Sequence, residues 1–102
     1  MNLLDKVKML KISSIKILDY YKILCVFNTG EIRILDIQQS LDKTNNLVQK
    51  LTNHEVFNTA KIGQFGEIYW EEIGEIQELD GTISKCNYDI SPEFVLYNSS
   101  KV

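Results

Sequence analysis

The side chains that could bind a metal ion in this chain are one histidine and a run of carboxylates. The histidine is His54, and the run consists of Glu71, Glu72, Glu75 and Glu78. Hard cations need several oxygen ligands, but the run lacks the loop glycine and the spaced Asp and Asn residues of an EF-hand. Zinc sites need further His or Cys ligands at short spacing, and His54 has none. We therefore expect a surface histidine and a solvated acidic loop, with no metal site and no cofactor.

The two cysteines are the candidates for nucleophilic catalysis. Cys25 lies in an apolar run, where cysteine behaves as a small hydrophobic residue. Cys86 follows Lys85, whose charge favours the thiolate, but a nucleophile also needs a base beside it, and His54 is distant in sequence. No catalytic residue is therefore predicted, and a non-enzymatic role is favoured. A small metal- or ligand-dependent enzyme that uses His54 and the acidic 71–78 cluster is the alternative.

Charge is distributed unevenly along the chain. The formal net charge is −3 and the pI is about 5.1, which argues against direct contact with nucleic acid. No basic residue occurs between Glu67 and Asp80. The first 24 residues, in contrast, contain five lysines: Lys6, Lys8, Lys11, Lys16 and Lys22. Such a separation of charge can orient a partner protein or a second copy of the chain.

Two aromatic residues stand immediately before the acidic run. Trp70 shares a strand face with Ile68 and is expected in the core, whereas Tyr69 lies among glutamates and is expected at the surface. Aromatic residues are enriched where proteins bind one another. The predicted partner-binding residues are accordingly Tyr69, Glu71, Glu72, Glu75 and Glu78.

The elements that would position these residues include a clear β-hairpin. Tyr21–Phe27 and Glu31–Ile37 read as strands joined at Asn28-Thr29-Gly30, where glycine supplies the positive φ of a tight turn. The first strand is apolar on both faces, which predicts a central place in a sheet. In the second strand, Ile32 and Ile34 are expected on one face, and Glu31 and Arg33 on a solvated face.

Further strands are predicted at residues 14–18, 60–64 and 67–71. A second hairpin is expected at 76–83, because Asp80-Gly81 is a strong turn signal. Helical spacing occurs at 44–51, while residues 53–57 read as a linker that ends in a buried Phe57. Ser91 before Pro92 is typical of the start of a short helix. A short amphipathic helix is also expected at the start of the chain, with Leu3, Leu4, Val7 and Leu10 on one face.

These elements predict an α+β fold with a small, mostly antiparallel sheet and one or two short helices packed on it. Residues 1–102 form one domain, because the chain has no room for a second core. The tail 98–102 is expected to fray. No signal peptide or membrane-spanning run is recognised, so a cytoplasmic location is expected.

The order of the elements resembles that of a small prokaryotic family of unknown function catalogued as DUF2442. The resemblance covers about Ile15 to Ser99 and rests on Tyr21, Leu24, Val26, Phe27, Gly30, Glu31, Arg33, Asp36, Phe57, Ile68, Trp70, Asp89, Pro92, Leu96 and Tyr97. The chain departs from the family pattern by inserting residues 71–88 between Trp70 and Asp89. Some relatives look like the N-terminal part of helix-turn-helix proteins. The resemblance therefore implies an interaction or sensing module more than an enzyme.

Taken together, the residues and the resemblance favour a non-enzymatic protein-interaction or accessory module in a regulatory locus. Its partner is expected to be another protein or a second copy of the chain, and neither nucleic acid nor a membrane is expected to bind directly. Besides the enzyme alternative, a third hypothesis is that the chain is a DNA-associated regulator that acts through a partner.

Overall fold

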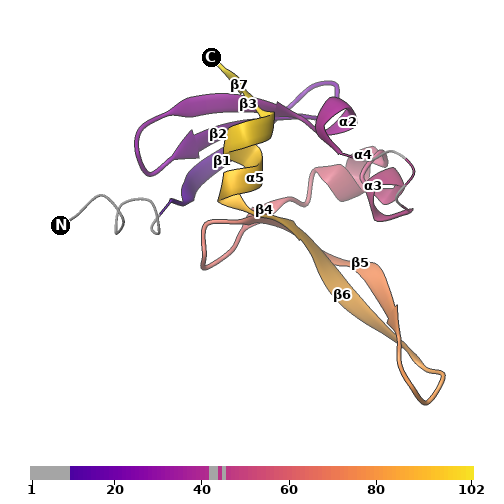
Figure 1. The fold of residues 1–102 in the computed structure, drawn as a ribbon. Helices are drawn as coiled ribbons and strands as arrows, with labels where there is room; N and C mark the ends of the chain where they lie inside the picture. Colours follow the sequence, from indigo (N-terminus) through magenta and orange to yellow (C-terminus); the bar gives the residue numbers. More distant parts are fainter. Residues whose placement is uncertain (1–9, 42–43, 45) are drawn as a thin grey trace.

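The strands of this protein form two antiparallel sheets, one of four strands and one of three (Figure 1). The computed structural model describes residues 10–41, 44 and 46–102. The α+β class and the antiparallel pairing expected from the sequence are confirmed. The leading helix expected from Leu3 to Leu10, together with Lys6 and Lys8, falls almost entirely outside the described residues.

The four-stranded sheet has the order β1-β2-β3-β7. Its strands are β1 (Ile12–Leu18), β2 (Lys22–Phe27), β3 (Ile32–Asp36) and β7 (Ser100–Lys101). β2 lies between β1 and β3, as its apolar sequence predicted. The β2–β3 turn is closed by hydrogen bonds between Phe27 and Glu31 at 2.9 Å and from Gly30 to Phe27 at 2.9 Å, and Gly30 has a φ of +90°.

The residues of β3 alternate between two faces as predicted, but the expectation that the face of Glu31 and Arg33 is solvated is wrong. Leu35 is fully buried, whereas Ile32 is 44% exposed. Arg33 lies on the same face of β3 as Leu35 and opposite the buried Cys25 of β2, so its side chain lies on the core side of the sheet. Only 14% of the Arg33 side chain is exposed. Apolar residues occupy both phases of this strand, so alternation alone did not identify the buried face.

Three short helices connect the two sheets: α2 (Ile37–Ser40), α3 (Asn46–Lys50) and α4 (His54–Phe57). The linker expected at 53–57 is in fact the helical turn α4. Asn53 is its N-cap, with Oδ1 accepting from the amides of Glu55 at 3.0 Å and Val56 at 3.3 Å. Phe57 is buried at the end of this helix, as expected.

The three-stranded sheet consists of β4 (Lys61–Ile62), β5 (Ile68–Gln77) and β6 (Ile83–Ile90). A short strand and a separate hairpin were expected in this region. The structure has one long hairpin instead, because β5 continues through Glu71 to Gln77 and pairs with β6 on both sides of an irregularity between Trp70 and Gly74. The turn signal was read correctly, since Gly81 has a φ of +90° and its amide donates to Glu78 O at 3.0 Å.

The chain ends in α5 (Pro92–Asn98) followed by β7. Ser91 caps α5 as predicted, with Oγ accepting from the Phe94 amide at 3.1 Å. The expectation that residues 98–102 fray is corrected by the pairing of β7 with β3, which places Ser100 opposite Ile34. In Figure 1, α5 crosses one face of the four-stranded sheet. Its Val95 is fully buried and belongs to the core cluster.

One hydrophobic core joins both sheets and α5. Its members are Ile12, Ile23, Cys25, Phe27, Leu35, Ile37, Leu51, Phe57, Ile68, Trp70, Ile90 and Val95. A row of aromatic rings runs through it, with centroids 5.3 Å apart from Tyr21 to Phe57, 6.3 Å from Phe57 to Trp70, and 6.0 Å from Trp70 to Tyr88. This row holds the base of the β5–β6 hairpin against the rest of the protein.

Candidate interaction surface

The β5–β6 hairpin projects from the body of the protein (Figure 1). Its base is held by Trp70 and Ile68, which are completely buried, and by Ile90, which is 5% exposed. We call residues 71–87 the arm. The molecule measures 48 × 32 × 20 Å, an elongated outline for 102 residues. The arm contains four of the five predicted partner-binding residues: Glu71, Glu72, Glu75 and Glu78.

An irregular pairing gives the arm its direction where it leaves the core. Three residues of β5 lie between Trp70 and Gly74, whereas one residue of β6 lies opposite them. Glu72 in this bulge has a φ of +56°, and its amide donates to Asn87 Oδ1 at 3.1 Å. Lys50 Nζ on α3 donates to Ile73 O at 2.8 Å. The bulge and the lysine therefore fix the base of the arm to the body.

Two of the four glutamates in the arm form ion pairs. Glu71 lies 3.1 Å from Lys61 Nζ, and Glu75 lies 2.9 Å from Lys85 Nζ. The hydrogen bond and the charge of Lys85, with a further contribution from Lys50, lower the pKa of Glu75 below 4.5. Within the described residues, Glu72 and Glu78 take part in no ion pair. These two glutamates are thus the charges most available to a partner.

The end of the arm exposes three aliphatic side chains. Ile76 is 52% exposed, Leu79 is 109% and Ile83 is 65%. The turn between them is held by Asp80, whose Oδ1 accepts from the amide and the hydroxyl of Thr82 at 3.0 and 2.7 Å. Those hydrogen bonds lower the pKa of Asp80. A hydrogen-bonded turn therefore presents apolar side chains to solvent beside carboxylates.

Tyr69 and Trp70 lie on opposite faces of β5, as the alternation along the strand predicted. Trp70 is fully buried, and its Nε1 donates to Phe57 O at 3.1 Å, which confirms it as a core residue. Tyr69 is half-buried between Lys61 and Asp89 on the other face. Tyr69 and Glu71 line an open hollow of about 380 Å³ together with Asn87 and Asp89. The predicted tyrosine thus lies at the foot of the arm rather than at its end.

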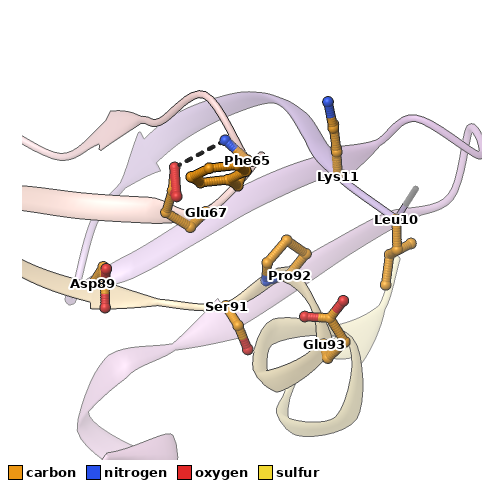
Figure 2. Close-up of a pocket in the computed structure, with 8 residues that line it drawn as sticks. All are labelled: Leu10, Lys11, Phe65, Glu67, Asp89, Ser91, Pro92 and Glu93. Atoms are coloured by element: carbon orange, nitrogen blue, oxygen red, sulfur yellow. Dashed lines mark hydrogen bonds between the residues drawn. The ribbon is translucent and has the colours of Figure 1, made fainter. Parts of the chain in front are cut away.

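A second hollow of about 350 Å³ lies between the β4–β5 turn and the start of α5 (Figure 2). Figure 2 shows Phe65 and Glu67 on its upper side, where the Phe65 amide donates to the Glu67 carboxylate at 3.3 Å. The remaining polar residues of its lining are Lys11, Asp89, Ser91 and Glu93. Three carboxylates and one lysine make the hollow net acidic, and its described lining contains neither a thiol nor an imidazole.

The residues considered for catalysis lie apart from one another. His54 belongs to α4, where its ring packs edge-on against Tyr21 with centroids 6.4 Å apart. Cys86 lies opposite Gly74 in the arm, while Cys25 is buried and its burial raises the thiol pKa to about 12. In the part of the chain that the structure describes, no three His, Cys, Asp or Glu side chains converge as a metal site. The acidic cluster is therefore not joined by His54.

Sequence reasoning missed the exposed aliphatic residues of the arm. Ile76, Leu79 and Ile83 were read only as parts of a hairpin, because single apolar residues in a strand usually face a core. A signal was present nonetheless. Ile76 and Leu79 stand among Glu75, Gln77, Glu78 and Asp80, a polar setting that is unusual for strand residues facing a core.

Comparison with known proteins gives one match. The model of a family described as a protein of unknown function, DUF2442, matches residues 12–99. No curated protein and no solved structure matches the chain. Among the described residues, no helix is both long and apolar enough to cross a membrane.

Proposed function

The chain belongs to the DUF2442 family, and we propose that it is a non-enzymatic protein-interaction module whose binding surface is the arm. The observation that carries this proposal is the exposure of Ile76, Leu79 and Ile83 on a hairpin outside the core. Leaving aliphatic groups in water is energetically unfavourable for a folded protein. A projecting cluster of exposed aliphatic side chains is therefore typical of a surface that binds a partner.

The charges on the arm indicate what kind of surface the partner presents. Glu72 and Glu78 are exposed and unpaired within the described residues, and Asp80 adds a third carboxylate at the turn. A partner that combines apolar side chains with lysine or arginine would satisfy both features. Tyr69 and Glu71, at the foot of the arm, would lie at the rim of such a contact.

The fixed base of the arm supports this role. The Lys50 contact to Ile73 O at 2.8 Å and the bulge at Glu72 restrict how the hairpin leaves the body. A surface that is ordered before binding loses less conformational entropy when it binds. The acidic run, expected from the sequence as a solvated loop, lies on β5 and the turn that follows it, which supports the proposal of an ordered surface.

Capture from a lysate of the native host tests the proposal. The immobilised chain is compared with Leu79→Ser and with Glu72→Gln/Glu78→Gln, and bound proteins are quantified by mass spectrometry at several salt concentrations. We expect both variants to lose the proteins retained by the wild type, and the charge variant to show a flatter salt dependence. Glu55→Gln/Glu93→Gln, which removes two exposed carboxylates from α4 and α5, is the matched control.

Retention of the same proteins, with the same salt dependence, by all three variants would overturn the proposal. Circular dichroism and a thermal melt of each variant establish that losses of binding do not reflect unfolding. The arm lies outside the core cluster, so we expect little change in stability from substitutions at positions 72, 78 and 79.

A further inference from the structure

The four-stranded sheet has a second apolar face, opposite the core. Pairing places Leu24 opposite Lys16 and Ile34, and Val26 opposite Ser14 and Ile32, on the side away from the buried Cys25. We call this the outer face. Its aliphatic members are Leu18, Leu24, Val26, Ile32 and Ile34.

The aliphatic side chains of the outer face do not belong to the core. None is among the buried residues, and Ile32 is 44% exposed. α5 cannot cover them, because its buried Val95 packs in the core with Leu35 on the opposite side of the sheet. An antiparallel sheet with one solvated face normally carries polar residues there. This outer face instead carries a block of four aliphatic residues on the adjacent strands β2 and β3 (Leu24, Val26, Ile32 and Ile34), with Leu18 at the end of β1.

Two lysines accompany this surface. Lys16 and Lys22 lie in outer-face positions of β1 and β2, and neither forms an ion pair within the described residues. Asp36 lies opposite Lys22 on β3, where its Oδ1 caps α2, so the outer face carries two lysines against one aspartate. The outer face is therefore apolar with a net positive charge, whereas the arm is apolar and negative. The two surfaces are complementary, and both belong to the same chain.

We propose that the outer face binds the arm of a second copy of this chain, and that the exchange is reciprocal. Ile76 and Leu79 of one copy would pack on the aliphatic residues of the other, with Glu72 and Glu78 facing Lys16 and Lys22. This inference rests on the proposed function and names its partner. Reciprocal exchange about a twofold axis closes the assembly at two copies.

The dimensions of the two surfaces agree. A strand advances about 3.3 Å per residue, so Gly74–Glu78 extends roughly 17 Å beyond the bulge. Four strands spaced about 4.8 Å apart make a sheet roughly 14 Å across. The arm is therefore long enough to cross the outer face. A stable interface buries about 800 Å² on each partner, and each copy contributes both an arm and a face toward this area.

Charge exchange between the two surfaces provides the test. Lys16→Glu/Lys22→Glu makes the outer face acidic, and Glu72→Lys/Glu78→Lys makes the arm basic. Each variant alone places like charges opposite each other, so we expect its dimer to dissociate about tenfold or more readily than the wild type. A mixture of the two variants pairs opposite charges at both contacts and should restore the dimer. Glu55→Lys/Glu93→Lys is the control and should dimerise like the wild type.

Light scattering coupled to size-exclusion chromatography measures the outcome over a range of concentrations. The chain has a mass of 11.8 kDa, so a dimer has twice that mass. A monomeric wild type, or a mixture that fails to recover the dimer mass, overturns self-association. The lysate capture is a separate readout: if arm variants lose a bound protein while the wild type is monomeric, the proposed function stands and this inference fails.

Discussion

Arg33 on β3 donates a 2.7 Å hydrogen bond from Nε to Ser99 Oγ, directly after α5. Its Nη2 also donates to Ser99 O, and its Nη1 lies 3.0 Å from the Glu31 carboxylate. A charged side chain that is only 14% exposed needs such partners, because burial without them is costly. One arginine therefore holds the C-terminal helix and β7 against the four-stranded sheet.

Replacing this arginine should release the end of the chain. We expect Arg33→Met to lower the free energy of unfolding by about 1–3 kcal/mol, because Ser99 loses both donors. Urea denaturation measures this change, and faster hydrogen exchange at Ser100–Val102 should accompany it. Arg33→Lys keeps the charge but not the planar set of donors, so its effect should be intermediate. Unchanged exchange in Arg33→Met would contradict the role assigned to this contact.

Gly66 should tolerate substitution less well than Gly30. Both have positive φ, +77° and +90°, but a Cβ at Gly66 would lie 2.4 Å from Lys11 Cβ. A Cβ at Gly30 would have no atom of the described residues within 4 Å apart from its chain neighbours. Gly30→Ala should cost about 1–2 kcal/mol through its backbone conformation alone. Gly66→Ala should cost roughly 1–3 kcal/mol more, because β1 must move away from the turn. Thermal or urea unfolding of both variants compares them, and equal losses would contradict the clash.

The two thiols should differ in reactivity. Burial raises the pKa of Cys25 from 9.0 to about 12, so Cys25 stays protonated in the folded protein at pH 8. Cys86 is half-exposed on the arm. We expect iodoacetamide to modify Cys86 in the native protein and Cys25 only in denaturant, as read by peptide mass spectrometry. Rapid native labelling of Cys25 would show that the core opens more readily than its burial implies.

The raised pKa of Cys25 determines how the stability of the folded protein changes with pH in the alkaline range. A group with a raised folded pKa contributes its stability below the unfolded pKa and loses it as pH rises toward the folded value. For Cys25 the loss of stability begins near pH 9.0, the unfolded pKa, and continues toward the folded pKa of about 12. Cys25→Ala should remove this component of the alkaline decline, which denaturation at a series of pH values measures.

The Glu75 carboxylate should titrate below its ordinary pKa of 4.5, because Lys85 bonds to it. A lowered folded pKa means that the pair stabilises the protein above the unfolded pKa and that this contribution is lost as pH falls through the folded value. NMR titration of the carboxyl carbon measures the shift. Lys85→Met should raise the pKa toward 4.5, whereas Lys61→Met, which removes the partner of Glu71, should leave Glu75 largely unchanged.

Local chemistry allowed much of the fold to be predicted. The turn at Gly30, the turn at Gly81 and the Ser91 cap each depend on neighbouring residues, and all three are present. The face of β3 depends on a distant partner, because Arg33 is satisfied by a residue 66 positions away. Alternation within the strand contains no information about Ser99, so the buried face was assigned incorrectly.

The candidate surface was predictable in its charges but not in its apolar part. The glutamates of the arm stand out in the sequence because no base interrupts them. The outer face does not stand out in the sequence, because Leu24 and Ile34 are residue types that any buried strand would carry. The direction in which they point follows from the register of β2 with its neighbours, which is a property of the whole sheet.

The pairing of β7 with β3 has a consequence for synthesis on the ribosome. Ile34 pairs with Ser100 in the sheet, and 66 further residues must be translated after Ile34 before Ser100 has been synthesised. At roughly 5–20 residues per second, this delay lasts about 3–13 s. Throughout it, β3 presents an open edge able to pair with a neighbouring nascent chain. Sites where translation slows after codon 36 would prolong that exposure, so the yield of soluble protein should depend on codon choice between the codons of β3 and those of β7.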